Sequence, residues 1–386
     1  MRRTVQRLRV LVVEPAGLLW GSERALLDLL SHLDKSRYDV TVVCPKDSPF
    51  LERVRRLNFC VMEAPLQLLH LRGHRARLHA LVALTAIMIR IRPHVVHVNQ
   101  AGVARLVSLA SGIVGSRVLC HVRLFEDARR LSEGEAEWPR PHRLVAISNA
   151  ILFALTRSEP NNRTPIDRVY DPLDGQEFCR LAEKASGPAI RAELGIPESA
   201  VVVSLVGRVC EEKRQATLID AALIGRDDIF YLIIGGDPPP RAGKRVYREC
   251  LQERVQNSTL AGRVVFTGMR DDVAALLLAS NIVVLTSDEE PLGRVLLEAL
   301  SLKRHIVAPT SGGAHEIVGN DERGLSFAAG DANALAACIS AIITDEATAR
   351  SRTERGVKWI ESVCSPTRHA REIEKIYDEL GASVNR

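Results

Sequence analysis

Two glutamates, Glu290 and Glu298, bracket a turn and the start of a predicted helix. The apolar run Ile282–Leu285 before them has the length of a buried strand, and Pro291 and Gly293 mark the turn. One continuous helix would rotate the two side chains through more than two turns, so they would not align. We therefore expect Glu290 on the loop and Glu298 inside the helix, where they could hold two ends of one polar ligand. Two solvent-facing glutamates are the alternative, because the two residues before Glu290 are also acidic.

Two cations follow another predicted strand at a spacing that suits a diphosphate. Gly207 comes directly after the apolar run Val201–Val206, and Arg208 and Lys213 flank the loop that leads to a helix near Gln215. An arginine fork and a lysine point charge at the carboxyl end of a strand can together clamp phosphate oxygens. Two surface cations balanced by the neighbouring glutamates would give the same pattern.

Glycine turns open two further predicted helices, at Gly21-Ser22-Glu23 and at Gly312-Gly313. Free backbone N–H groups at a helix start attract anions, although a Gly-Ser pair is also a plain turn. His121 lies near the end of the predicted strand that begins at Arg117, where a polar side chain could enter a cleft. A lone histidine is more often structural, so this residue is the weakest candidate of the set.

These candidates are all positioned by strands that alternate with amphipathic helices. In the first half the predicted strands are Leu8–Val13, Asp39–Cys44, Phe59–Met62, His94–Val98, Arg117–Val122, Arg143–Ile147 and Arg168–Tyr170. In the second half they are Val201–Val206, Phe230–Ile234, Arg263–Phe266, Ile282–Leu285 and His305–Ala308. This alternation predicts an α/β protein with two doubly wound domains, each a parallel sheet covered by helices on both faces.

Composition shifts suggest where the domains end. Gly187-Pro188 reads as a linker, which places a first domain at 1–186 and a second at 187–365. The last segment, 366–386, is predicted to be a charged helix that packs back on the first domain. The eight cysteines form no C-x-x-C pair, which disfavours a zinc site and fits a reducing cytoplasm.

Charge is distributed unevenly along the chain. The net charge is +5, yet the segment 64–125 contains no acidic residue and several arginines. Such a segment is either a solvated basic face or a surface that attracts an anionic partner, such as a membrane. Nucleic acid is not the expected partner, because only 4% of the residues are aromatic and no recognition motif accompanies the charge. The apolar stretch Leu78–Ile91 is too short to span a bilayer, and no signal-peptide pattern is evident.

Taken together, these motifs resemble glycosyltransferase family 4, whose members have the GT-B fold of two facing Rossmann-like domains. The resemblance rests on motifs in both halves of the chain: Gly21-Ser22-Glu23, Arg92–Val98, Ala146–Ala150, Val169–Phe178, Gly207-Arg208-x4-Lys213, Phe266-x-Gly268, Glu290-x7-Glu298 and Gly312-Gly313-x-x-Glu316. Because they cover nearly the whole chain in the same order, the resemblance is specific.

The resemblance implies a retaining, metal-independent transfer of a sugar from a nucleotide diphosphate to an acceptor hydroxyl. Arg208 and Lys213 would hold the diphosphate, Glu290 and His121 would lie beside the donor sugar, and Glu298 would bind ribose hydroxyls. The remaining donor-binding positions implied by the family are Gly21, Gly207, Phe266, Gly268, Pro291, Leu292 and Gly293.

No cofactor is implied. The donor would be a UDP-, GDP- or similar nucleotide sugar, and the acceptor a sugar, a glycolipid or a lipid-linked saccharide. These roles suit polysaccharide, lipopolysaccharide or glycolipid synthesis in the cytoplasm, with peripheral binding at the inner membrane face through 64–125. A nucleotide-sugar epimerase of the same shape and a catalytically silent sugar-nucleotide-binding protein are the alternatives.

The sequence departs from the family pattern at three places. Ser22 replaces the commoner second glycine of the first loop, and Arg214 follows Lys213 where glycine is frequent. Asp171-Pro172 stands where many members have Asn-Gly, which leaves the role of Asp171 open. None of these changes removes a charged donor-binding residue.

Overall fold

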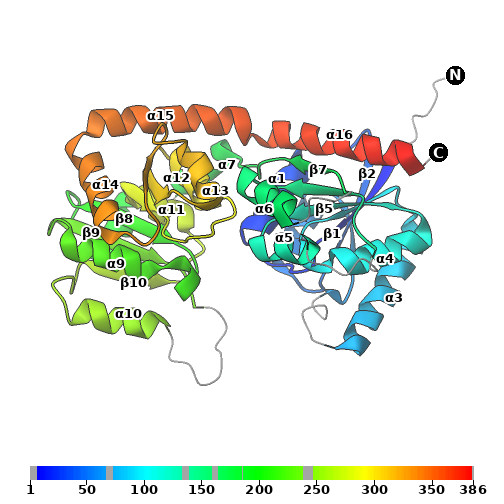
Figure 1. Cartoon of the computed structure of the whole chain (residues 1–386), viewed down its shortest axis with the longest axis horizontal. Coiled ribbons are helices and arrows are strands. Elements are labelled where there is room, and N and C mark those ends of the chain that lie inside the picture. Colours follow the sequence, from blue (N-terminus) through cyan, green and yellow to red (C-terminus); the bar gives the residue numbers. More distant parts are fainter. Residues whose placement is uncertain are drawn as a thin grey trace. The chain divides into compact units, whose positions relative to one another are not determined.

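The computed structural model describes residues 7–66, 73–132, 139–158, 164–184, 186–237 and 247–384. The chain divides into two compact units, each coloured by sequence in Figure 1. Unit 1 comprises Met1–Pro172 and Cys364–Arg386, and unit 2 comprises Leu173–Val363.

The strands of unit 1 form one parallel seven-stranded sheet in the order β3-β2-β1-β4-β5-β6-β7. Its strands are β1 Leu8–Val13, β2 Tyr38–Cys44, β3 Cys60–Glu63, β4 Val95–Val98, β5 Arg117–Val122, β6 Arg143–Ala146 and β7 Ile166–Arg168. The central strands are rich in valine and leucine and buried on both faces, as expected for a parallel sheet covered by helices. Its helices are α1 Gly21–His32, α2 Pro49–Arg56, α3 His74–Ile91, α4 Ala104–Val114, α5 Phe125–Ser132, α6 Asn149–Ser158 and α16 Pro366–Val384, with a 3₁₀ turn at Ala101–Val103.

Unit 2 is built on a parallel six-stranded sheet in the order β10-β9-β8-β11-β12-β13. Its strands are β8 Val201–Val206, β9 Ile229–Ile234, β10 Val264–Gly268, β11 Ile282–Val284, β12 His305–Pro309 and β13 Leu325–Phe327. Its helices are α7 Gly175–Glu183, α8 Gly187–Glu193, α9 Gln215–Ile224, α10 Tyr247–Gln256, α11 Val273–Ala279, α12 Arg294–Ser301, α13 Gly312–Val318, α14 Ala332–Thr344 and α15 Glu346–Val363, with a 3₁₀ turn at Glu211–Lys213. Two parallel Rossmann-like sheets confirm the predicted fold class.

The boundary between the units differs from the prediction. Unit 2 begins at Leu173 rather than at residue 187. The reason is α7, which packs against α11 and α12 of unit 2, where the Cys179 thiol lies 3.2 Å from the carbonyl oxygen of Ser301. The Gly187-Pro188 pair that suggested a linker instead begins α8, with Ser186 as its N-cap.

The last helix, α16, completes the core of unit 1. Its apolar side chains join the cluster formed by β1, β2 and α1, including Ile373 and Tyr377, both fully buried. The Tyr38 hydroxyl group from β2 donates to Asp378 of α16 at 2.8 Å. Residues from opposite ends of the chain therefore build one hydrophobic core.

Several elements were not predicted or were misplaced. Strand β13 and helices α14 and α15 were not predicted, and β7 begins two positions earlier than expected, at Ile166. The sequence of residues 131–142, with two prolines and three glutamates, predicts an irregular loop, and this segment falls partly outside the described residues. Among the residues that the structure describes, no helix is long and apolar enough to cross a membrane.

Candidate active site

The candidate site in unit 2 lies where the direction of the sheet reverses. The chain proceeds from β8 to β9 on one side and from β11 to β12 on the other. The loops after β8 and β11 therefore leave the sheet in opposite directions at its carboxyl edge, the place where doubly wound sheets bind ligands. Arg208 and Lys213 lie on the first of these loops, and Glu290 lies on the second.

Lys213 and Glu290 form an ion pair between these two loops. The Nζ atom of Lys213 donates to Oε2 of Glu290 at 2.6 Å, and both side chains are partly exposed, at 25% and 14%. Ser287 donates to the same carboxylate oxygen at 3.0 Å, and Thr286 donates to the carbonyl oxygen of Lys213 at 2.6 Å. Residues far apart in the sequence thus form one charged group at the edge of the sheet.

A second ion pair, between Arg214 and Asp288, joins the same two loops. Arg214 has φ 47°, a left-handed conformation that is unfavourable for a residue with a side chain. This is the position at which the family more often has glycine. Here the charged side chain ties the β8 loop to the β11 loop.

The β11 loop is also packed tightly against the start of α13. A Cβ atom on Gly313 would lie 2.1 Å from the carbonyl oxygen of Pro291, and one on Gly312 would lie 2.5 Å from that of Glu290. The Gly313 N–H donates to the Glu290 carbonyl oxygen at 2.7 Å. Two glycines are therefore required for α13 to support the loop that carries Glu290.

Helix α12 begins directly after this loop. Gly293 is its N-cap with φ 90°, which glycine adopts without steric cost, and Leu292 is buried. Glu298 lies one turn inside the helix, is 9% exposed, and accepts from Nε of Arg294 at 3.3 Å. The structure thus places Glu290 on the loop and Glu298 in the helix, at the two positions expected from the sequence.

The β8 loop brings Gly207 and Arg208 to the same edge. The N–H of Gly207 donates to the carbonyl oxygen of Ile234 at 2.9 Å, which extends the ladder between β8 and β9 past the strand end. The Arg208 side chain is exposed, and Nε2 of Gln215 donates to its carbonyl oxygen at 2.8 Å. This bond fixes the backbone of the loop while the guanidinium group faces solvent.

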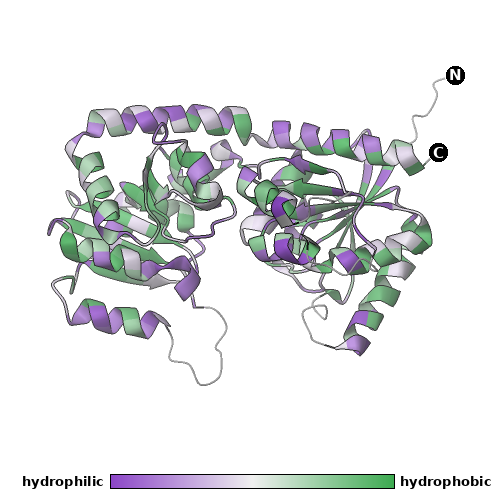
Figure 2. Cartoon of the chain, viewed as in Figure 1, coloured by the Kyte–Doolittle hydropathy of each residue, from purple (hydrophilic) through white to green (hydrophobic). Residues whose placement is uncertain are grey.

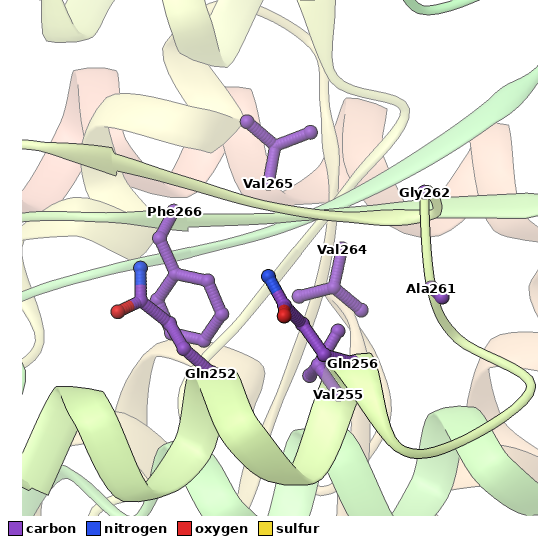
Figure 3. Close-up of a pocket in the computed structure, with 8 residues that line it drawn as sticks. All are labelled: Gln252, Val255, Gln256, Ala261, Gly262, Val264, Val265 and Phe266. Carbon is purple, nitrogen blue, oxygen red and sulfur yellow. The ribbon is translucent and has the colours of Figure 1, made fainter.

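Phe266 differs from its prediction. Its ring points from β10 toward α10 and lines a pocket of about 490 Å³ with Gln252, Val264 and other residues, as Figure 3 shows. The ring therefore packs on the hydrophobic core of unit 2 instead of standing at the carboxyl edge. Gly268, two residues on, ends the strand, and its carbonyl oxygen accepts from Gly235 at 3.0 Å.

Unit 1 has a polar network at the corresponding edge of its own sheet. Glu14 follows β1 and is fully buried. It accepts from the N–H of Ala16 at 2.7 Å, from Asn99 at 2.5 Å and from Gln100 at 3.2 Å. Burial raises the pKa of Glu14 to about 7, with a further contribution from the negative charge of Glu23. Glu14 thereby holds the loop that leads to Gly21, the exposed first residue of α1.

The network continues to Arg123, which follows β5. Arg123 donates to both oxygens of Asn99, at 3.2 Å and 3.0 Å, and forms a buried ion pair with Asp171. Glu14, Asn99 and Arg123 each come directly after a strand of the sheet. The sequence contains this signal, because each of the three polar residues directly follows a run that is predicted to be a strand.

His121 is not exposed at this edge, so the expectation that it enters a cleft is wrong. Its side chain is fully buried, and its Nδ1 lies 2.6 Å from Nε2 of His97. Its ring also stacks on that of His369 from α16, with centroids 5.9 Å apart. The strand is buried on both faces, so His121 points toward α16, and Arg123 is the residue that reaches the strand end.

Two family models match the sequence of the chain. The model described as "Glycosyl transferase 4-like domain" matches residues 21–159, and "Glycosyl transferases group 1" matches residues 187–359. The fold and the switch-point site define a GT-B glycosyltransferase. The chain belongs to the glycosyltransferases of the family 4 type.

Individual relatives support the same class. The chain is 34% identical over 166 residues to the lipopolysaccharide core biosynthesis glycosyltransferase LpsE of Rhizobium meliloti, which covers 43% of this chain and 46% of that protein. It is 26% identical over 239 residues to N-acetyl-alpha-D-glucosaminyl L-malate synthase of Bacillus anthracis, covering 61% and 59%. The chain thus matches about half the length of these relatives.

Solved structures agree on the fold. Anabaena HepE, in complex with UDP and glucose, superposes with a TM-score of 0.80 at 19% identity, over 97% of this chain and 100% of that one. At this identity the likeness shows the architecture alone.

Proposed function

We propose that this glycosyltransferase moves a sugar, with retention of configuration and without a metal ion, from a nucleotide-diphosphate donor to an acceptor hydroxyl group. One observation carries the proposal: Lys213 and Glu290 form an ion pair at 2.6 Å at the switch point of the unit 2 sheet. A cation and a carboxylate at that separation suit the two sides of the bond that breaks, between the sugar and the diphosphate.

The leaving group explains the need for cations. When the sugar departs, negative charge grows on the nucleoside diphosphate, and Lys213 with Arg208 would stabilise it in place of a divalent ion. The first N–H groups of α12 would add to this field. Because Lys213 is paired in this structure, donor binding would exchange the carboxylate of Glu290 for a phosphate oxygen.

The carboxylates would orient the donor. Glu290 would accept hydrogen bonds from hydroxyl groups of the sugar once Lys213 turns to the phosphate, and Glu298 would accept from the ribose. The backbone of Pro291, Leu292 and Gly293 would lie beside the diphosphate. Gly207 would let the chain turn out of the sheet after β8. Gly268 would lie near the base, whereas the ring of Phe266 faces the core.

The relatives suggest the substrate class. LpsE is named as a lipopolysaccharide core enzyme, and HepE was solved with UDP and with UDP-glucose. We therefore propose a UDP-, GDP- or similar nucleotide sugar as donor and a sugar, glycolipid or lipid-linked saccharide as acceptor, in the synthesis of cell-surface glycans. No cofactor is proposed. Unit 1, with Gly21 at the carboxyl edge of its sheet, would bind the acceptor. The transfer reaction would occur in the cytoplasm at the membrane face.

A donor screen tests the binding step. Nucleoside diphosphates and nucleotide sugars should raise the melting temperature of the protein, because a ligand that binds only the native state stabilises it. The substitution Glu298→Gln should reduce this shift for nucleotides that carry a ribose while leaving the unliganded melting temperature nearly unchanged. The absence of a shift with every nucleotide tested would contradict the donor site.

The reaction itself is tested by its product. With the best donor and a saccharide acceptor, the new glycosidic bond should have the anomeric configuration of the donor, as read by NMR coupling constants. Donor alone should not be epimerised, which separates the transferase from the epimerase alternative. Activity should survive an excess of EDTA; complete loss that added metal restores would refute the metal-free mechanism.

A further inference from the structure

Helix α3 of unit 1 exposes a row of large apolar side chains on the side opposite its core contacts. It buries only Ala80, Leu84, Ile87 and Met88. Three other residues are more than half exposed: Leu78 at 61%, Val82 at 60% and Ile89 at 55%. Isolated exposed apolar residues are ordinary, but a row of them on one helix indicates an interaction surface.

These three residues form one narrow stripe. With about 100° of rotation per residue, Leu78, Val82 and Ile89 lie within roughly 40° of one another around the helix axis. Leu84 and Ile87 lie on the far side and pack into unit 1. Figure 2 shows hydrophobic residues along much of α3. We call Leu78, Val82 and Ile89 the α3 stripe.

Arginines stand at both ends of the stripe. Arg75 lies one turn before Leu78 and Arg90 follows Ile89, and both are exposed. The helix has no acidic residue, and none occurs anywhere in 64–125. An apolar stripe with cations at its ends and no acidic residue on its own helix matches a surface that has negative groups outside and hydrocarbon beneath.

The neighbouring helix α4 adds to the apolar area. Its last turn packs on the end of α3, where Ser111 contacts Met88 and the Ser116 hydroxyl group donates to the Pro93 carbonyl oxygen at 2.7 Å. Ile113, in that last turn, is 64% exposed. Helix α4 therefore exposes a further apolar residue in its last turn.

We propose that the α3 stripe and its arginines dock unit 1 on an anionic lipid surface, with the helix lying in the plane of the interface. Leu78, Val82 and Ile89 enter the boundary between headgroups and acyl chains, and Arg75 and Arg90 contact lipid phosphates. A second copy of the chain is a poorer occupant, because a symmetric contact through this face would bring its arginines toward those of the partner without any acid to neutralise them. This docking gives a defined surface to the membrane association proposed above, and it does not depend on the transfer reaction.

Vesicle co-sedimentation without substrates tests the proposal. The full chain should bind vesicles that contain phosphatidylglycerol, bind pure phosphatidylcholine vesicles weakly, and lose binding as salt is raised. The variant Arg75→Gln/Arg90→Gln should lose about 25-fold in partition at low salt, since each cation near an anionic surface contributes roughly fivefold. The variant Leu78→Ser/Val82→Ser/Ile89→Ser should lose at least tenfold.

Matched controls come from unit 2. Leu223→Ser/Ile224→Ser removes two exposed apolar residues, 40% and 55% exposed, from the end of α9. Arg180→Gln/Arg350→Gln removes two exposed cations from α7 and α15. Neither control should change vesicle binding, and all four variants should keep the circular dichroism spectrum of the parent.

Two results would overturn the proposal. One is vesicle binding that both α3 variants retain in full. The other is a dimer in sedimentation velocity that the serine variant abolishes while no vesicle is bound, which would assign the stripe to a second copy. Since no nucleotide sugar is present, either result leaves the proposed transfer reaction untouched.

Discussion

The ion pair between Lys213 and Glu290 is the central feature at the scale of single residues. The two residues lie far apart in the sequence, yet the Nζ atom of Lys213 lies 2.6 Å from Oε2 of Glu290. Partial exposure weakens such a pair as a source of stability, and the proposed donor site would give its placement at the switch point a function. In the proposed mechanism, the pair would keep both groups in place until the donor binds.

The substitution Lys213→Ala should reduce kcat/KM by about 10–150-fold. The reason is loss of one charge-assisted contact to the leaving diphosphate, about 1.5–3 kcal/mol of transition-state stabilisation. Steady-state kinetics with the donor found in the screen would measure it. Lys184→Ala, at an exposed lysine of unit 2, is the matched control and should leave the kinetics unchanged. Parent-like kinetics for Lys213→Ala would remove this residue from the site.

At the scale of elements, the site depends on close packing between two loops. Helix α13 can support the Glu290 loop only because Gly312 and Gly313 have no side chains. The ion pair between Arg214 and Asp288 then ties that loop to the one after β8. The positions of the charged groups are thus set by backbone contacts as much as by the strands themselves.

The substitution Gly313→Ala should lower the free energy of unfolding by about 1–3 kcal/mol, because its methyl group must displace the backbone at Pro291. It should also weaken donor binding, because Glu290 moves with that backbone. Denaturant unfolding and the donor-induced melting shift would measure the two effects. Gly112→Ala is the contrasting control: no atom lies within 4 Å of its added Cβ. It should stabilise α4 by about 0.5–1 kcal/mol. If Gly313→Ala behaved like Gly112→Ala, the tight contact would be refuted.

At the scale of the whole molecule, α16 packs on unit 1 through hydrogen bonds between buried histidine and tyrosine residues. Nδ1 of His97 lies 2.6 Å from the Tyr377 hydroxyl group, and Nδ1 of His369 lies 2.8 Å from the carbonyl oxygen of Tyr170. Burial lowers the pKa of His97 to about 3 and that of His369 to about 4. The pKa of His121 is also lowered, mainly by burial. All three rings are therefore neutral in the folded state at neutral pH.

Acid should therefore weaken unit 1 through these histidines. A histidine whose pKa is lower in the folded state than its unfolded value of about 6.5 binds its proton more readily in the unfolded chain. Its contribution to the stability of the folded state is therefore full above pH 6.5 and is lost as the pH falls toward 4. For His369 the loss between pH 7.5 and 5 is about 2 kcal/mol. Glu14, with its raised pKa, acts in the opposite direction over the same range, so the effect must be read as a difference between variants.

The substitution His369→Asn isolates this contribution, since its amide can replace the Nδ1–H donor to Tyr170. Between pH 7.5 and 5 the variant should lose about 2 kcal/mol less unfolding free energy than the parent, measured by urea titration at each pH. His32→Asn, at an exposed histidine of α1, should lose as much as the parent does. An identical pH dependence for His369→Asn and the parent would show that His369 is not buried neutral.

The sequence by itself determined the fold class, most of the strands, and the placement of Glu290 on a loop and Glu298 in a helix. Val201–Val206 and Arg117–Val122 were predicted with the bounds that the structure gives. This succeeded because hydrophobic runs, glycines and turn residues act locally. Glu290 and Glu298 were assigned to loop and helix for the same reason: Pro291 and Gly293 interrupt the helix between them.

Only the tertiary structure decided which way buried side chains point and which distant residues meet. His121 faces α16 and Phe266 faces α10, because strands covered on both faces give no periodic signal to show direction. The contacts of Lys213 with Glu290, of Arg123 with Asp171, and of His97 with Tyr377 each join separate strands or the two ends of the chain. Such contacts depend on the order of strands in the sheet, and the local sequence does not specify that order.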